Sequence, residues 1–251
     1  MSKRKILMLA LSLCMVAILA VGGTLAYFTS DDSATNVFTI GNVEIDLIED
    51  YDQNSDLVPG LKINKDVFVE NTGSRPAYVR VHMAFPAAMD DGDPAYNASK
   101  NFLHWNFESA AYADGLWSFL PEYSEGTGYK GNGVGNWNYY ETEINGEPYA
   151  VYVATYRTAV AVEGKTELAL TQVYLDATVD ATANENGTVT YKDTNGNEVT
   201  LTAEEAANIK IYVVAEGTQV DTFENAYDAL NTAFGVPGSY TVAWPTWPTA
   251  D

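Results

Sequence analysis

The chain has 251 residues, a formal net charge of −21 and one cysteine, and 47% of its residues are hydrophobic. This acidity excludes a main role in binding nucleic acid, because phosphate backbones are bound by clustered Lys and Arg. The single cysteine excludes a disulfide framework, so the fold must depend on a hydrophobic core, which a chain of this length can supply.

The first 26 residues have the pattern of an export signal. Three cations at residues 3–5 precede an apolar run at 6–21, and Thr24 and Ala26 occupy the −3 and −1 positions before Tyr27. A basic start, a short apolar run and small residues before the cleavage point are typical of a secretory signal peptide. The alternative is an uncleaved membrane anchor, which needs about 20 apolar residues. We predict a signal peptide at 1–26 and a single secreted domain at 27–251, which meets the membrane only during export.

Strand patterns dominate the remainder of the chain. Alternating apolar residues at 42–49 predict a half-buried strand, and two further runs at 61–70 and 77–85 predict an antiparallel pair joined by a turn at 71–76. In the run at 61–70 we expect Leu61 to lie on the buried face with the other apolar residues. Later strands are expected at 149–160, 167–179 and 208–220, together with a hairpin at 187–202 whose tip is Asn195–Gly196.

One helix is predicted near the C-terminus. Asp221 is the expected N-cap, with Glu224 three residues later in a capping-box arrangement, and Gly235 ends the helical periodicity. Between residues 86 and 148 the strand pattern weakens, and we expect an insertion of loops and short helices. The predicted fold class is therefore all-β: a jelly-roll-like antiparallel β-sandwich with one helix in its C-terminal half and a long decorating insertion at 86–148.

Three segments carry a resemblance to a known family. The first contains a Gly-Gly-Thr-x-Ala leader at residues 22–26, followed by Tyr27, Phe28, Asp31, Phe38, Gly41, Val43 and Ile45. The second is 58–81 and the third is 213–230. In these segments the chain resembles the TasA/camelysin family of Gram-positive bacteria, and residues 183–207 look like a hairpin insertion relative to that family.

The resemblance implies secretion, a jelly-roll fold and assembly into extracellular fibres of a biofilm matrix or cell surface. The implied partners are a SipW-type signal peptidase during export, further copies of the chain, and other matrix or cell-wall components. Residues 27–40 would then be a mobile assembly segment that completes the sheet of the next subunit. Its apolar side chains are Tyr27, Phe28, Val37, Phe38 and Ile40. The alternative is that 37–48 forms an ordinary first strand within one chain.

The family also carries a metallopeptidase label, so a camelysin-type secreted metalloendopeptidase is an alternative function. The chain offers only His82 and His104, without an H-E-x-x-H motif; His104 and Glu108 have helical spacing. We therefore predict a protein that is not an enzyme and has no cofactor.

Calcium is the other metal that the sequence suggests. Asp193, Asn195, Asn197 and Glu204 have EF-hand spacing, but Glu198 stands where the loop requires Gly, so we favour the hairpin over a weak Ca²⁺ site. The acidic stretch that begins at Asp90 is interpreted as a solvated turn.

Aromatic residues of the insertion suggest a third function, a monomeric adhesin that stacks on sugars. The candidates are Trp105, Trp117 and Trp137. We favour the interpretation that these rings pack the insertion onto the sandwich, because large aromatic residues dominate core burial.

Overall fold

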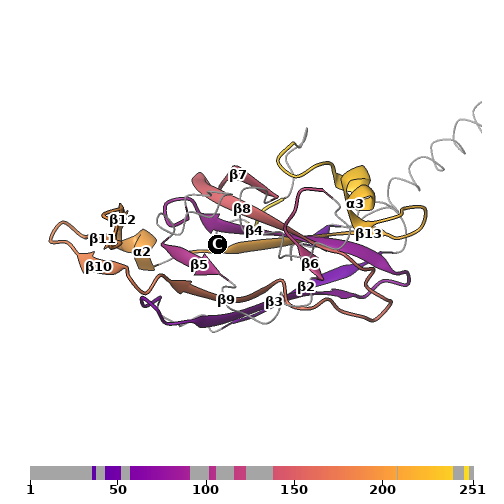
Figure 1. The fold of residues 1–251 in the computed structure, drawn as a ribbon, viewed down its shortest axis with the longest axis horizontal. Coiled ribbons are helices and arrows are strands. Elements are labelled where there is room, and N and C mark those ends of the chain that lie inside the picture. The colour runs from indigo at the N-terminus through magenta and orange to yellow at the C-terminus, as the bar shows by residue number, and fades with distance from the viewer. Residues whose placement is uncertain are drawn as a thin grey trace, which may run out of the picture.

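The computed structural model describes residues 36–37, 43–51, 57–90, 102–105, 116–122, 138–207, 209–239 and 246–248. These residues form two sheets packed face to face and a small third sheet at one end of the molecule (Figure 1). The arrangement confirms the predicted class, an all-β sandwich.

The main sheet has the strand order β1–β13–β4–β8–β6, and β7 also pairs with β8. Its strands are β1 (Asn36–Val37), β4 (Ala77–Pro86), β6 (Trp117–Ser118), β7 (Tyr139–Ile144), β8 (Glu147–Tyr156) and β13 (Tyr212–Gln219). The second sheet has the order β2–β3–β9–β5. Its strands are β2 (Ile45–Tyr51), β3 (Ile63–Asn71), β5 (Leu103–Trp105) and β9 (Leu170–Leu175).

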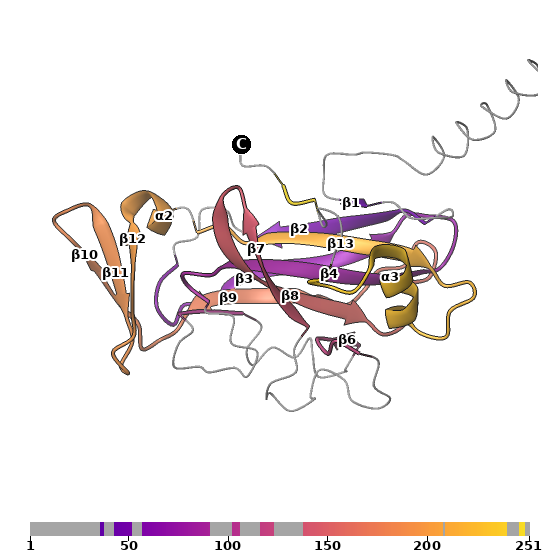
Figure 2. The same cartoon turned by 90° about the horizontal axis from the view of Figure 1, so that it is seen from above.

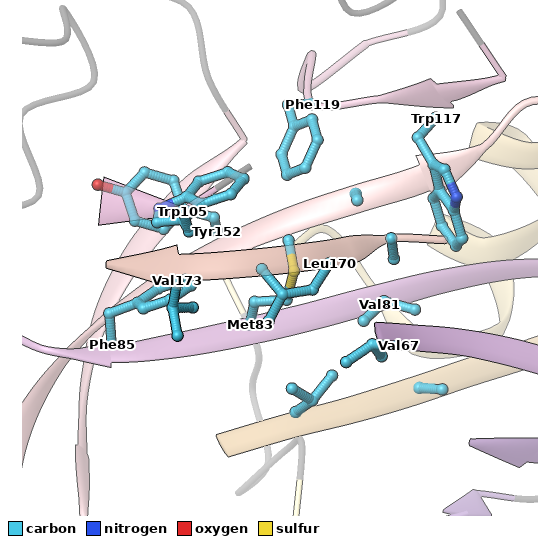
Figure 3. Close-up of a cluster of buried hydrophobic side chains, with 14 of the residues drawn as sticks. Val67, Val81, Met83, Phe85, Trp105, Trp117, Phe119, Tyr152, Leu170 and Val173 are labelled. Carbon is cyan, nitrogen blue, oxygen red and sulfur yellow. The ribbon is translucent and has the colours of Figure 1, made fainter. Parts of the chain in front are cut away.

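The core lies between these two sheets because alternate residues of each strand point inward. In β4 the inward residues Val79, Val81 and Met83 are fully buried, as are Val67 and Val69 of β3. Figure 3 shows side chains of both sheets meeting in this layer. Each large apolar side chain buried there contributes about 1.5–3 kcal/mol of transfer free energy.

The predicted antiparallel pair at 61–70 and 77–85 is wrong. The two strands form, but β3 pairs with β2 and β9 in the second sheet, whereas β4 pairs with β13 and β8 in the main sheet. The buried side chain of Asn71 stabilises the segment that connects β3 in one sheet to β4 in the other. Its Nδ2 donates to the carbonyl oxygens of Arg75 (2.8 Å) and Val160 (3.0 Å). Leu61, expected on the buried face, lies before β3 and is 54% exposed.

Two Asn–Gly turns form hairpins. The predicted hairpin at Asn195–Gly196 is confirmed as β11 and β12 of the small sheet. The sequence interpretation missed a second hairpin, β7–β8, which turns at Asn145–Gly146 with φ of 55° and 87°. Positive φ at both turn residues favours Asn followed by Gly.

The small sheet has the order β10–β11–β12, and a short helix that was not predicted follows it. Its elements are β10 (Asp180–Ala183), β11 (Thr188–Lys192), β12 (Glu198–Thr202) and α2 (Ala203–Ala207). Thr202 and Glu205 form a capping box, in which Thr202 N donates to Glu205 Oε2 (2.7 Å) and Glu205 N donates to Thr202 Oγ1 (3.2 Å).

The predicted C-terminal helix forms as α3 (Ala226–Phe234) and ends at Gly235 as expected. Its predicted N-cap, Asp221, is wrong. Residues 220–223 instead make a turn in which Phe223 N donates to Val220 O and Thr222 has a φ of 81°. The actual N-cap is Asn225, whose side chain accepts a hydrogen bond from Asp228 N.

The insertion at 86–148 supplies strands in the part that the structure describes. β5 joins the second sheet, and β6 and β7 join the main sheet. The short helices expected there are not found among the described residues of this range. The interpretation of Asp90 as a solvated residue is wrong, because Asp90 is 1% exposed and its Oδ1 accepts a hydrogen bond from Tyr152 OH (2.7 Å).

Candidate functional site

Strand β13 of the main sheet lies between β1 and β4. One edge of β13 pairs with β4 along its whole length, from Tyr212 to Gln219. On the other edge β1 runs parallel to it, with Asn36 opposite Ala215 and Val37 opposite Glu216. Among the described residues, β1 is the only strand paired to this edge, so it ends the main sheet.

β1 lies at the seam between the two sheets. It contacts both β13 of the main sheet and β2 of the second sheet, and Figure 2 shows the three strands side by side. The seam is tight at Gly217, where an added Cβ would lie 2.9 Å from Ile45 Cδ1 of β2. The absence of a side chain at Gly217 therefore lets Ile45 pack directly beneath β13.

A buried charged cluster lies on the opposite, outward face of the same strands. It consists of Arg80 and His82 of β4 and Glu216 of β13, each at most 2% exposed. Arg80 Nε donates to Glu216 Oε2, and His82 Nε2 lies 3.2 Å from Glu216 Oε1. Charged groups are buried in this way only when other groups of the protein pair with them.

Two elements cover the charged cluster. From α3, Asn231 Oδ1 and Gly235 O each accept a hydrogen bond from the Arg80 guanidinium at 2.8 Å. A cation at the C-terminus of a helix is also favoured by the helix dipole. From β7, Tyr140 OH lies 3.1 Å from His82 Nδ1. The cluster thus ties β13, β4, α3 and β7 together.

Burial and charge set the protonation of the charged cluster. Burial lowers the pKa of His82, although Glu216 acts in the opposite direction. Burial alone would raise the pKa of Glu216, but the charges and hydrogen bonds of His82 and Arg80 outweigh it and lower that pKa. Because His82 is easily deprotonated, Arg80 is the cation that faces Glu216 at neutral pH.

The sequence interpretation missed this cluster. Arg80 and Glu216 occupy outward positions of their strands, where polar residues normally meet solvent. One signal was available: β4 is apolar or aromatic at most outward positions too, including Tyr78 and Ala84. A strand that is apolar on both faces is typical of one covered on both sides.

Of the predicted assembly residues, the structure places only Val37, which lies in β1. Tyr27, Phe28, Phe38 and Ile40 lie outside the described residues, as do the cleavage-site residues Thr24 and Ala26.

The calcium candidates lie at the tip of the β11–β12 hairpin. Asp193 Oδ1 accepts hydrogen bonds from Asn195 N (2.9 Å) and Asn197 N (2.8 Å), and Asp193 Oδ2 accepts one from Asn197 Nδ2 (2.7 Å). The three residues are therefore joined by hydrogen bonds that close the turn.

The histidines do not fit a shared zinc site. His82 faces outward from the main sheet, whereas His104 faces outward from the second sheet, where its Nε2 lies 2.8 Å from Asp176 Oδ2. They are on opposite faces of the sandwich and cannot bind one ion. Across the described parts of the chain, no group of three or more His, Cys, Asp or Glu side chains is placed to hold a metal.

The insertion's tryptophans lie inside the protein where they are described. Trp117 is fully buried and Trp105 is 7% exposed, and Trp105 packs against Phe85, Phe119 and Tyr152 (Figure 3). This burial confirms the packing interpretation for both rings and leaves neither free to stack on a sugar; Trp137 lies outside the described residues.

Comparison with protein families finds a match at the N-terminal end of the chain. A family model described as camelysin metallo-endopeptidase matches residues 1–91. This match confirms the predicted resemblance to the TasA/camelysin family over that part of the chain. No curated protein matches the sequence. None of the helices formed by the described residues is long and apolar enough to cross a membrane.

Proposed function

We propose, from the camelysin-family match over residues 1–91 and the pairing of β1 with β13, that this chain is a secreted structural subunit of an extracellular fibre. In the proposed assembly, residues 27–40 of one subunit add a strand to the β13 edge of the next. The observation that carries the proposal is the parallel pairing of Asn36–Val37 with Ala215–Glu216 at the end of the main sheet.

The chemistry of a sheet edge supports this proposal. Unpaired backbone N–H and C=O groups on an edge strand form a template for an added strand. β13 spans Tyr212–Gln219, whereas β1 pairs with only two of its residues. A longer donated segment would satisfy more of these groups than β1 does.

The geometry is also compatible with a fibre. The donor is the N-terminal segment and the acceptor is the β13 edge, so the two contacting surfaces differ. Contacts between two different surfaces of identical subunits produce rings or open filaments. The alternative is that β1 completes the sheet of its own chain and has no role in assembly.

Removal of the N-terminal segment separates these alternatives. We expect the protein lacking residues 1–26 to form fibres in negative-stain micrographs and to sediment. The same protein lacking residues 27–40 should remain monomeric and folded, because the described core begins at Val43. A matched control deletes Asp193–Glu198 at the β11–β12 turn and should leave assembly unchanged. Fibres from the protein lacking 27–40 would rule out strand donation, and monomers from both would favour an accessory or adhesin role.

Secretion belongs to the same proposal. We expect a SipW-type signal peptidase to cut between Ala26 and Tyr27, within the region that matches the family model. N-terminal sequencing of the exported protein would identify Tyr27 as its first residue. An exported protein that retains the leader would instead indicate a membrane anchor.

A secreted metallo-endopeptidase is the second candidate, and the description of the matching family model is the observation that favours it. The positions of His82 and His104 on opposite faces weigh against a zinc site built from both. Bound zinc together with chelator-sensitive cleavage of casein by the purified protein would support the enzyme. Fibre formation without either property would support the structural role.

A further inference from the structure

We propose that Asn145 is a site of spontaneous deamidation, and that this modification releases the C-terminal segment around Trp247 from the main sheet. Asn145 and Gly146 form the exposed turn between β7 and β8. The chemistry needs only water as a co-reactant. The proposal does not depend on the fibre function.

The reaction takes place between Asn145 and the residue that follows it. The backbone nitrogen of Gly146 attacks Cγ of Asn145, and the side-chain amide leaves as ammonia, which carries away the proton that the Gly146 nitrogen loses. Glycine permits this close approach because it has no side chain. The product is a cyclic succinimide, and water opens it at either carbonyl to give aspartate or isoaspartate. The net change is therefore the exchange of one amide group for one carboxylate, with water consumed and ammonia released.

The hydrogen bonding of the attacking nitrogen distinguishes this site from similar ones. The described part of the chain has Asn–Gly pairs at 145–146, 186–187 and 195–196. The N–H groups of Gly187 and Gly196 each donate to a backbone carbonyl oxygen, at 3.1 Å and 3.2 Å. The N–H of Gly146 has no such acceptor among the described residues. Attack by the first two nitrogens must break a hydrogen bond, so we expect Asn145 to react first.

The side chain of Asn145 also contacts the C-terminal segment. Its Nδ2 donates to Pro248 O (3.2 Å) and to Tyr212 OH (3.3 Å), and Figure 2 shows the tail beside the β7–β8 turn. An ionised carboxylate accepts hydrogen bonds but cannot donate them. Deamidation therefore removes the bond to the Pro248 carbonyl and places a negative charge near that oxygen.

Trp247 is the side chain that this loss would expose. Its ring is half-buried and packs against an apolar cluster on the outer face of the main sheet, formed by Ala84, Ile144, Tyr149 and Val151. Within the described residues, this ring and the hydrogen bond from Asn145 hold the segment 246–248. Loss of one neutral hydrogen bond should shift the docking equilibrium about fivefold toward the released segment.

Timed incubation of the protein lacking residues 1–26 tests the site. Mass spectrometry of proteolytic peptides follows deamidation at Asn145, Asn186 and Asn195 in one sample kept in mildly alkaline buffer. Asn145 should react about fivefold faster than either of the others, the factor that corresponds to one hydrogen bond of about 1 kcal/mol. The other two sites are internal controls, because they have the same dipeptide and the same history. Equal rates at the three sites, or a slower rate at Asn145, would overturn the assignment.

A variant tests the release separately. Asn145→Asp reproduces one product of the reaction, and Asp–Gly also suits this kind of turn, so the hairpin should form. In protein labelled with fluorotryptophan, fluorine NMR reports Trp247, whose signal is assigned with Trp247→Phe. The ratio of released to docked Trp247 should rise about fivefold in Asn145→Asp.

Two controls keep the release falsifiable. The signal of Trp117, which is fully buried, should not move and so shows that the variant is folded. Asn195→Asp makes the same change at the β11–β12 turn and should leave the Trp247 signal unchanged. An unchanged Trp247 signal in folded Asn145→Asp, or an equal shift in Asn195→Asp, would refute the release.

Discussion

Replacement of Arg80 by methionine tests whether the charged cluster holds β13 and α3 to the main sheet. Arg80 is 2% exposed and donates to Glu216, to Asn231 and to the carbonyl of Gly235. Methionine fills much of the same space, so the main effect is electrostatic. The Glu216 carboxylate would remain fully buried without its cation, and such a loss costs about 3–5 kcal/mol.

A second substitution separates this cost from a simple loss of packing. Adding Glu216→Gln to Arg80→Met removes the charge that the first change leaves unpaired. The double variant should therefore be more stable than Arg80→Met alone, because replacing both members of a buried ion pair is often close to neutral. Lys192→Met is the matched control: Lys192 pairs with Glu198 on the surface, and its loss should have no measurable effect.

Urea unfolding followed by tyrosine and tryptophan fluorescence measures these free energies. We expect a lower midpoint with an unchanged slope for Arg80→Met and partial recovery for the double variant. A loss below about 1 kcal/mol for Arg80→Met would refute the reasoning. A double variant less stable than the single one would show that packing, not the unpaired carboxylate, dominates.

Three further substitutions follow from the structure. The pKa of His82 is lowered in the folded protein, so below pH 6.5 the unfolded state binds more protons and the stability falls as the pH drops. His82→Gln should flatten this pH dependence in unfolding curves measured at pH 5 to 7. An unchanged pH dependence of the variant's stability would contradict the prediction. Thr222→Gly should raise the stability by about 1 kcal/mol, because a β-branched residue at a φ of 81° is strained; a lower melting temperature would contradict this. Asn225→Ala removes the N-cap of α3 and should lower the free energy of unfolding by about 1 kcal/mol, as measured by thermal unfolding. An unchanged stability would instead support Asp221 as the N-cap.

The sequence predicted which residues point inward more reliably than which strands pair. Alternation at 77–85 identified the core residues of β4, because the side-chain period of a strand depends on local geometry alone. Pairing depends on contacts far apart in the chain. Only five residues separate β3 and β4, but the two strands do not form a hairpin. The hydrogen bonds of Asn71 stabilise a connection from one sheet of the sandwich to the other.

Short polar motifs were informative where they were recognised. Asn195–Gly196 predicted a hairpin correctly, and Asn145–Gly146 carried the same signal within a region assumed to be loops and helices. The α3 cap failed for a different reason. Asp221 and Glu224 have capping-box spacing, but the turn at 220–223 and the side chain of Asn225 compete with that arrangement.

Strand patterns indicate that β4 is covered on both faces, but they do not identify the charged cluster, because its burial depends on contacts with α3 and β7. The outward positions of β4 and β13 would be exposed in a bare sheet. α3 follows β13 directly and packs on this face through Ala229 and Leu230 against Tyr78. This contact, together with the cover that β7 supplies over His82, buries Arg80 and Glu216.

The same contacts bear on the proposed assembly, because they fix β13 on three sides. β4 pairs with one edge, the charged cluster holds the outward face, and Ile45 packs beneath Gly217 on the inward face. The edge that receives β1 is then rigid before any strand is added, and preorganisation lowers the entropic cost of binding. In the proposed fibre, most of that cost falls on the donated segment. Arg80→Met should therefore slow fibre growth even at temperatures where the variant is fully folded, as followed by sedimentation, whereas Lys192→Met should not.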